Sequence, residues 1–254
     1  MKQYSTIIGG NIVNIPDKKI FPGKIHISNG KIEKIEPTNE TVEGVYILPG
    51  LVDAHIHIES SMLSPQQFSR VALRHGTVGT VSDPHEIANV LGEEGIRFMV
   101  NNARQSPLKI NFGVPSCVPS TPFETSGAVI DSKKVKELLQ EDQFRYLSEM
   151  MNFPGVLAQD EEVMNKIKAA QAAGRPVDGH APGLRGVDLR KYIDSGITTE
   201  HECSTYDEAK EKLEKGMKIQ IREGSAARNF DALYSLIQEH PDQVMLCSDD
   251  QIGR

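Results

Sequence analysis

The chain has 254 residues, which suits one large domain or a large domain joined to a small one. Its formal charge is −7 with both signs mixed along the chain, so we expect no nucleic-acid partner. Three cysteines without a CxxC pair, no signal-peptide core and no apolar run near the ~20 residues of a membrane span predict a cytoplasmic protein without membrane contact.

Residues 1–47 differ in pattern from the rest of the chain. Short apolar runs are broken by Gly, Asn and Pro, and Asn29-Gly30 is a strong signal for a β-hairpin. We therefore expect a small antiparallel β segment of the sandwich type, separate from the domain that begins at residue 48. His26 falls in one of its strands, where we interpret it as a surface residue rather than a ligand.

From residue 48 onward, strand-like segments alternate with helical ones. The expected strands are 51–57, 77–82, 109–114, 145–149, 176–180, 197–201, 217–222 and 244–249, and the expected helices lie near 65–75, 86–104, 132–141, 160–173, 184–195, 205–215 and 229–240. Eight strands with helices between them predict a (β/α)8 TIM-like barrel over residues 48–254. A doubly wound open sheet is the alternative, but no Gly-rich phosphate fingerprint follows the first strand. The closing helix and a carboxyl-terminal part are absent, so we expect a barrel that is incomplete after strand eight.

The first expected barrel strand ends in two histidines, within LPGLVDAHIHIESSM at residues 48–62. Residues i and i+2 of a strand point the same way, so His55 and His57 project together from one face. Neutral imidazole is a common ligand of zinc, iron and manganese. An HxH pair alone is weak evidence, because such pairs also occur on polar strand faces.

Further chemistry-bearing side chains fall at the ends of later strands. These are Glu149, His180, His201 and Asp249. In a barrel the carboxyl ends of all strands meet at one pole, which is where such enzymes carry their chemistry. A single histidine there is more often a hydrogen-bonded core residue, but four with two carboxylates predict a metal centre. A cation would also keep the crowded imidazoles neutral.

Eight segments of the chain carry a resemblance to a known family. They are HIHIESSM, SDPHEIANVLG, VPSCVPSTPFE, LSEMMNFPGV, DGHAPGL, TTEHE, REGSAARN and LCSDD. Over nearly its whole length the chain resembles the amidohydrolase superfamily of metal-dependent hydrolases, and within it the members that deaminate adenine. The HxH pair is generic to the superfamily, whereas SDPHEIANV and VPSCVPS are much more specific.

The resemblance implies a centre of two divalent ions, of manganese, iron or zinc. His55 and His57 would hold one ion with Asp249, whereas His180 and His201 would hold the second. Glu149 would bridge the two ions, since no lysine lies at the end of strand four to serve as the carboxylated bridge that many superfamily members use. Members that deaminate adenine are considerably longer, so we expect this chain to be a fragment with little or no activity alone.

The implied reaction is hydrolytic deamination of adenine to hypoxanthine and ammonia by a metal-activated hydroxide, a step of purine salvage. Asp249 would take the proton of the attacking water and pass it to ammonia. Asp250 could exchange roles with Asp249, although only one of two adjacent strand residues should face inward. The ring nitrogen N1 must also gain a proton, for which the candidates are Glu59, Glu202 and Glu223.

Five side chains are candidates for contact with the substrate: Glu59, Asp83, His85, Arg222 and Ser225. Asp83 and His85 follow strand two, where the alternative is that one of them caps the next helix. Arg222 and Ser225 follow strand seven, where an ordinary solvated loop is the alternative.

Two other functions stay open. The first is another amidohydrolase, such as a dihydroorotase or hydantoinase that opens a cyclic amide, although SDPHEIANV and the missing lysine count against it. The second is a non-catalytic fragment that binds metal or a partner chain. The expected partner is the small molecule adenine, and the sequence leaves a homo-oligomer open.

Overall fold

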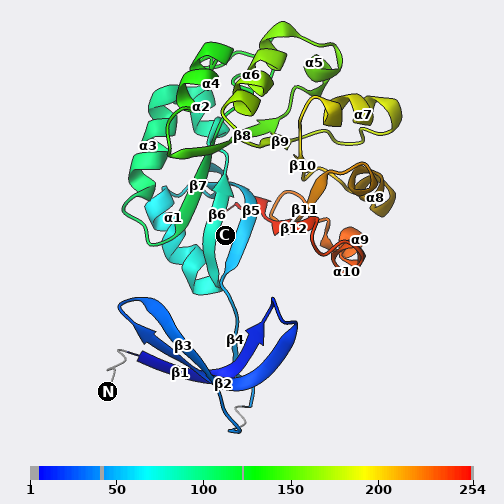
Figure 1. Ribbon diagram of the computed structural model, residues 1–254. Helices are drawn as coiled ribbons and strands as arrows, with labels where there is room; N and C mark the ends of the chain where they lie inside the picture. Colours follow the sequence, from blue (N-terminus) through cyan, green and yellow to red (C-terminus); the bar gives the residue numbers. More distant parts are fainter. Residues whose placement is uncertain (1–5, 41–42, 122, 253–254) are drawn as a thin grey trace. The chain divides into compact units, whose positions relative to one another are not determined.

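The computed structural model describes residues 6–40, 43–121 and 123–252 (Figure 1). The chain divides into two compact units, Met1–Gly50 and Leu51–Arg254, and each is described here by itself. No described helix combines the length and the apolar character that crossing a membrane would require.

The first unit contains one four-stranded sheet. Its strands are β1 (Thr6–Asn14), β2 (Lys19–Ser28), β3 (Lys31–Pro37) and β4 (Tyr46–Ile47), in the order β3-β2-β1-β4. Asn29 and Gly30 connect β2 to β3 with φ values of 51° and 72°, which confirms the predicted hairpin. The surface position expected for His26 is wrong. Its strand lies between two others, the residue is 8% exposed, and its Nε2 lies 2.8 Å from Oε2 of Glu36.

The second unit is built on parallel strands. They are β5 (Leu51–His57), β6 (Thr77–Ser82), β7 (Lys109–Val114), β8 (Phe144–Met150), β9 (Val177–Gly179), β10 (Thr199–Glu200), β11 (Lys218–Arg222), β12 (Val244–Cys247) and β13 (Asp249–Asp250). A six-stranded sheet has the order β13-β5-β6-β7-β8-β9, and a three-stranded sheet has the order β10-β11-β12. The larger sheet curls into a half-barrel, so the unit is a partial TIM barrel (Figure 1).

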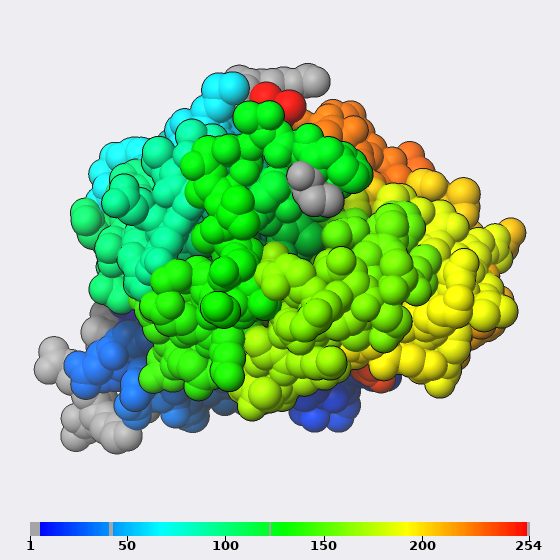
Figure 2. Space-filling model, turned by 90° about the horizontal axis from the view of Figure 1, so that it is seen from above, coloured from blue at the N-terminus to red at the C-terminus, as the bar shows by residue number. Residues whose placement is uncertain are grey.

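The two sheets meet at both of their edges through backbone contacts. At one edge the amide of Thr198 donates to the carbonyl of Val177 over 3.0 Å. At the other, β13 follows β12 after Ser248 and pairs with β5. In the space-filling view the red segment near residue 250 accordingly lies beside the cyan segment near residue 60 (Figure 2). Each predicted strand has an observed counterpart whose ends differ by about two residues or less.

The helical segments flank these strands. They are η1 (Ile58–Ser61), α1 (Pro65–Ala72), η2 (Leu73–His75), α2 (His85–Leu91), α3 (Glu93–Ala103), α4 (Ser132–Leu138), α5 (Phe153–Leu157), α6 (Glu161–Ala172), α7 (Gly186–Asp194), α8 (Tyr206–Glu214), α9 (Phe230–Leu233) and α10 (Ser235–Glu239). The single helix predicted at 86–104 is two helices, because Gly92 adopts φ 61° and ψ −141° between them. The helix predicted near 229–240 is also divided, and α5 was not predicted.

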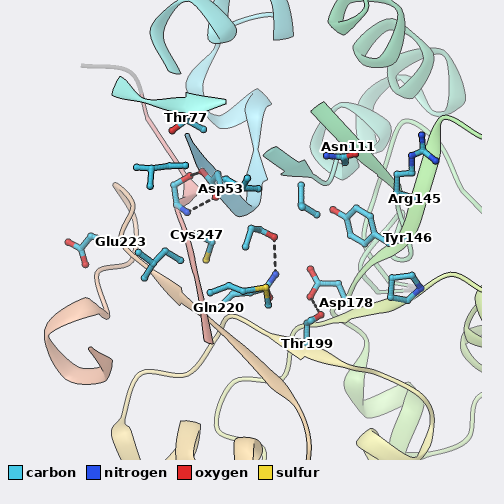
Figure 3. Close-up of a pocket in the computed structure, with 18 residues that line it drawn as sticks. Asp53, Thr77, Asn111, Arg145, Tyr146, Asp178, Thr199, Gln220, Glu223 and Cys247 are labelled. Carbon is cyan, nitrogen blue, oxygen red and sulfur yellow. Dashed lines mark hydrogen bonds between the residues drawn. The ribbon is translucent and has the colours of Figure 1, made fainter. Parts of the chain in front are cut away.

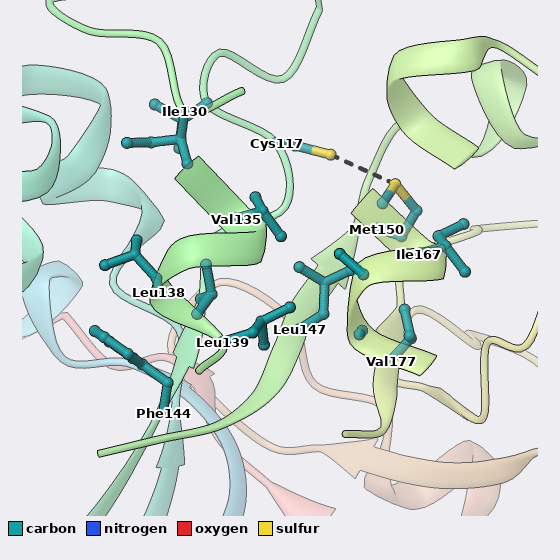
Figure 4. Close-up of a cluster of buried hydrophobic side chains, with 14 of the residues drawn as sticks. Cys117, Ile130, Val135, Leu138, Leu139, Phe144, Leu147, Met150, Ile167 and Val177 are labelled. Atoms are coloured by element: carbon teal, nitrogen blue, oxygen red, sulfur yellow. Dashed lines mark hydrogen bonds between the residues drawn. The ribbon is translucent and has the colours of Figure 1, made fainter. Parts of the chain in front are cut away.

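Helices α4 and α6 pack on β8 through a cluster of buried apolar side chains (Figure 4). Leu138 of α4, Leu147 of β8 and Ile167 of α6 are fully buried. Burying each such side chain contributes about 1.5–3 kcal/mol. This packing fixes β8, and with it the position of Glu149 at the end of that strand.

Candidate metal centre

The six side chains predicted as metal ligands all come from the carboxyl ends of strands. His55 and His57 end β5, Glu149 lies in β8, His180 follows β9, His201 follows β10 and Asp249 lies in β13. Five of them are at most 7% exposed, and His180 is half-buried. Strand alternation therefore delivers these imidazoles and carboxylates to one protected place.

The first group consists of His55, His57 and Asp249. The two Nε2 atoms are 3.1 Å apart, and Oδ1 of Asp249 lies 3.5 Å from Nε2 of His55 and 3.2 Å from Nε2 of His57. Ligands about 2.0–2.1 Å from one tetrahedral ion are separated by about 3.3 Å. The spacing of the group therefore suits three ligands of one ion. Asp249 reaches this position with a left-handed backbone, at φ 59°.

Glu149 lies between this group and a second pair of histidines. Its Oε1 is 3.1 Å from Nε2 of His57, and its Oε2 is 2.7 Å from Nδ1 of His180 and 3.2 Å from Nε2 of His201. Burial opposes ionisation of the carboxyl. Hydrogen bonds from His180, His201 and His57 outweigh burial, so they hold the pKa of Glu149 well below its ordinary value. One carboxylate thus faces both groups with different oxygens.

The charges of the first group are strongly coupled. Burial lowers the pKa of His55, but hydrogen bonds to Asp178 and Asp249 outweigh it and raise that pKa to about 10. Burial likewise opposes the negative charge of Asp249, whereas His55 and His57 lower its pKa. The carboxylates of Asp178 and Asp249 thus stabilise a positive charge on His55. They would stabilise a divalent cation in the same way, and binding of the cation would displace the proton from the imidazole.

Hydrogen bonds behind the rings set their orientation. Nδ1 of His55 lies 2.9 Å from Oδ2 of Asp178, and Nδ1 of His57 lies 3.0 Å from the carbonyl oxygen of Asp83. Both Nε2 atoms therefore face the centre. Sequence reasoning missed Asp178, although it precedes His180 by two residues within the strand predicted at 176–180. The rule of strand alternation could have found it.

Asp83 and His85 also face the centre. Nδ1 of His85 lies 3.1 Å from Oδ2 of Asp83 and 3.3 Å from Oε1 of Glu149. The alternative that one of them caps α2 is wrong, because Pro84 occupies the N-cap position and no side-chain cap bond forms there. The other oxygen of Asp83 is buried without a hydrogen-bond partner among the described residues.

The three candidates for protonating the substrate ring lie in different surroundings. Oε2 of Glu59 is buried without a hydrogen-bond partner in the described structure, and burial raises the pKa of this residue to about 7. Glu202 binds Arg222, with Oε1 2.5 Å from Nη1. Oε2 of Glu223 accepts the amide of Phe230 over 3.2 Å. Among the three, Glu59 is thus the candidate whose unpaired oxygen is buried.

Arg222 contributes to the centre through other side chains. Its Nη1 lies 2.8 Å from Oδ2 of Asp249, so the arginine holds that carboxylate from behind. Ser225 lies farther along the chain, where its Oγ accepts the amide of Ile252 over 3.1 Å. Asp250 turns toward Oγ of Ser60, so Asp249 is the member of the pair that faces the histidines.

Several overlapping groups among the described residues could hold an ion. They are His57, Asp83, His85 and Glu149; His55, Asp178 and His201; His55, His57 and Asp249; Glu149, His180 and His201; and His201, Glu202 and Asp249. Within each group the ligand atoms lie within 4.8 Å of one another. Imidazole nitrogen with carboxylate oxygen suits zinc, iron and manganese. An unpaired oxygen on buried Asp83 and an unpaired Nδ1 on buried His201 also favour a bound cation.

A cavity of about 830 Å³ lies elsewhere in the second unit. Asp53, Tyr146, Asp178 and Gln220 line it, and Figure 3 shows Asp178 and Thr199 turned toward each other at its edge. None of the six predicted ligands lines this cavity. Asp178 belongs to both the cavity and the candidate metal centre, because it lines the cavity and its Oδ2 contacts His55.

Comparison with known proteins gives two kinds of match. Residues 46–253 match the model of the amidohydrolase family. Proteins named adenine deaminase from Methanosarcina mazei, Salinibacter ruber and Borreliella burgdorferi are 59%, 55% and 51% identical over 98%, 96% and 96% of this chain. The chain spans only 44–45% of the length of these relatives.

Solved structures of lower identity share the fold. N-acetyl-D-glucosamine-6-phosphate deacetylase from Mycobacterium smegmatis is 14% identical, with a TM-score of 0.65 over 95% of this chain and 76% of that one. Atrazine chlorohydrolase from Arthrobacter aurescens, complexed with zinc, is 11% identical, with a TM-score of 0.63 over 96% and 71%. The family match and the clustered imidazole and carboxylate side chains together indicate a divalent metal.

Proposed function

The chain belongs to the amidohydrolase family, and from this premise we propose that it forms part of an enzyme that deaminates adenine to hypoxanthine and ammonia. The identity of 51–59% to proteins named adenine deaminase supports this substrate. The proposal rests on the position of Glu149. One of its carboxylate oxygens faces His57, and the other faces His180 and His201.

Within this proposal, residues 1–47 are a small β domain and residues 48–254 carry the eight strands of a (β/α)8 barrel. The division of the chain near residue 50 supports two domains. The parallel order of the strands supports the barrel. We also propose a cytoplasmic role in purine salvage, with adenine rather than a nucleic acid as the partner.

Two divalent ions, of manganese, iron or zinc, fit the side chains present. His55, His57 and Asp249 would hold one ion, His180 and His201 would hold the other, and Glu149 would lie between them. Such ions supply Lewis acidity and make a water molecule acidic enough to lose its proton near neutral pH. The distances of 3.1–3.5 Å within the first group support its assignment to one ion.

Asp249 and Glu59 would move the protons of the reaction. Asp249 faces the centre with Oδ1, while Arg222 holds Oδ2, so the carboxylate is oriented to receive the proton of the attacking water and return it to ammonia. Glu59 has an uncommitted buried oxygen from which N1 of the ring could receive a proton. Glu149 stays ionised between the two groups of histidines.

The remaining candidates would position the purine. His85 contacts both Asp83 and Glu149, and Asp83 and His85 would offer polar atoms to one edge of the ring. Arg222, the last residue of β11, and Ser225, which follows that strand, are proposed for the opposite edge. Arg222 would act mainly by orienting Asp249, since its Nη1 binds the carboxylates of Asp249 and Glu202. Its Nε donates to Oδ1 of Asn229 over 3.3 Å.

The direct test is release of ammonia from adenine by protein reconstituted with manganese, iron or zinc. Dihydroorotate and hydantoin serve as control substrates, because related amidohydrolases open such rings. Among these substrates we expect turnover of adenine only, weak or absent in this chain and full in a protein extended to the length of its relatives. Turnover of a cyclic amide without turnover of adenine would overturn the proposed substrate, and bound metal with no turnover of any of them would favour a non-catalytic fragment.

A further inference from the structure

Lys212 of α8 is a fully buried lysine outside the set of predicted site residues. Its Nζ lies 2.8 Å from Oε1 of Glu208, 2.9 Å from the carbonyl oxygen of Ala181 and 3.7 Å from Oε2 of Glu200. Burial opposes the charge, but Glu200 and Glu208 outweigh burial and raise the pKa of Lys212. A buried ammonium ion with these partners is a fixed point in the structure.

Glu200 connects this lysine to two segments that carry predicted ligands. The carboxylate is fully buried. Its Oε2 accepts the amide of Ala181 over 2.9 Å, and its Oε1 accepts the amide of Glu202 over 2.7 Å. Ala181 directly follows His180, and His201 lies between Glu200 and Glu202. One carboxylate therefore holds the backbone beside both histidines.

Glu208 adds a further attachment to the same segment. Its Oε1 accepts the amide of Gly183 over 2.8 Å as well as the ammonium group of Lys212. The segment after His180 is thus held at both the amide and the carbonyl of Ala181 and at the amide of Gly183. Buried hydrogen bonds that are all satisfied hold their groups in one arrangement.

Backbone pairing supplies little of this attachment, because the one backbone hydrogen bond described at this edge, from Thr198 to Val177, lies before both histidines. His180 follows β9, which is an edge of the six-stranded sheet, whereas His201 follows β10, which is an edge of the three-stranded sheet. β10 itself is only Thr199–Glu200. The ladder that fixes neighbouring strands in a continuous sheet is therefore not formed between β9 and β10.

We propose that Lys212 is a positioning residue that sets the spacing of His180 and His201 through Glu200 and Glu208, and so the affinity for the second ion. The proposal rests on the proposed metal centre but not on adenine as the substrate. Lys212 lies behind the two ligands and contacts neither of them in the described structure. Its effect is therefore expected on the second ion and not on the first.

The test compares Lys212→Met with the unsubstituted protein by titration with Co²⁺, following the visible absorption of the bound ion. Losing such an indirect contact typically weakens metal binding about 10–100-fold. We expect that loss for the second ion alone, so that the protein binds one ion where the unsubstituted protein binds two. Lys212→Arg keeps the charge and is expected to recover most of the affinity. Arg97→Met, which breaks the 2.8 Å pair with Glu141, is the control.

Glu200→Gln provides a second route if Lys212→Met does not fold. The amide side chain has one acceptor oxygen for two backbone donors, so it should weaken the second ion in the same way. Unchanged affinity for both ions in a folded variant, or equal weakening of both, would overturn the proposal. Selective loss of the second ion in Lys212→Met would support the positioning role even if the extended protein opened a cyclic amide and not adenine, a result that would overturn the proposed substrate alone.

Discussion

The two groups of histidines in the centre are held by different means. His55 and His57 share one strand, and Asp249 lies on β13, whose pairing with β5 sets it opposite Ile56. His180 and His201 follow strands of two separate sheets. The first group is thus aligned by a continuous backbone ladder, and the second by buried side chains.

This difference predicts how each group responds to substitution. A backbone ladder persists when a neighbouring side chain is changed, because its hydrogen bonds come from the main chain. A network of buried charges fails when one member is removed, because the remaining charges lose their compensation. Distant side chains should therefore matter more for His180 and His201 than for the β5 pair.

The largest expected effect comes from Asp249→Asn, which keeps the shape of the first group and removes the proton acceptor. In a protein extended to the length of its relatives, turnover of adenine should fall about 10²–10⁴-fold, as for loss of a general base. Asp250→Asn is the matched control, because Asp250 contacts Ser60 and should retain near-normal turnover. The opposite pattern in steady-state assays would reverse the roles of the two residues.

Glu149→Ala tests whether the two groups form one centre. Elemental analysis should find about two ions in the unsubstituted protein, as a carboxylate shared between two ions implies. The substitution should weaken both ions by more than the about 10–100-fold expected for an indirect contact. Loss of only one ion, or a single ion in the unsubstituted protein with Glu149 unbound, would contradict the binuclear centre.

Asp178→Asn tests whether the carboxylate of Asp178 orients His55 in the first group. The substitution removes the charge that Nδ1 of His55 contacts at 2.9 Å but keeps the shape of the side chain. Affinity for the first ion should fall about 10–100-fold, with little change for the second. Competition between Co²⁺ and a chelator measures both constants. Selective loss of the second ion instead would place Asp178 in the other group.

Metal removal should have a pH-dependent effect on stability. Without metal the pKa of His55 is raised from 6.5 to about 10, so its protonation stabilises the fold fully below about 6.5, and that contribution is lost as the pH rises through 10. A chelator should therefore lower the melting temperature more at pH 9 than at pH 6. Thermal unfolding at both values measures this, and an equal loss at both would argue against protons replacing the ion.

The smallest effect is expected at the surface. Val52 and Leu246 are 57% and 49% exposed, whereas Ile56 on the same strand as Val52 is fully buried. Replacing both exposed residues by serine should change the free energy of unfolding by less than about 0.5 kcal/mol each. It should also reduce self-association, measured by sedimentation, if this apolar surface drives it. A large loss of stability would show that these side chains are covered in solution.

Much of the centre was accessible from sequence because its ligands follow local rules. Strand alternation placed His55 and His57 together, and strand ends located Glu149, His180, His201 and Asp249. Lys212, Glu200 and Glu208 were not accessible in the same way. Their importance comes from contacts between α8 and the segment after β9, and no local periodicity encodes such contacts.

The fold shows the same limit. Alternating apolar residues predicted the strands, but they did not predict that β10 would shorten to two residues and separate two sheets. The break at Gly92 was missed because glycine is tolerated inside helical patterns. A side chain at this position would also place its Cβ 2.9 Å from that of Ala128, which only the folded structure reveals.

The left-handed backbone of Asp249 restricts its replacement for reasons unrelated to chemistry. At φ 59° a β-branched residue is strained by about 1–2 kcal/mol, whereas aspartate, asparagine and glycine adopt the conformation readily. Position 249 is thus constrained in two independent ways, by the backbone conformation that it adopts and by the proton transfer proposed for it. In a library of all twenty amino acids, several small residues should survive a screen for soluble expression, and aspartate alone should survive a screen for growth on adenine.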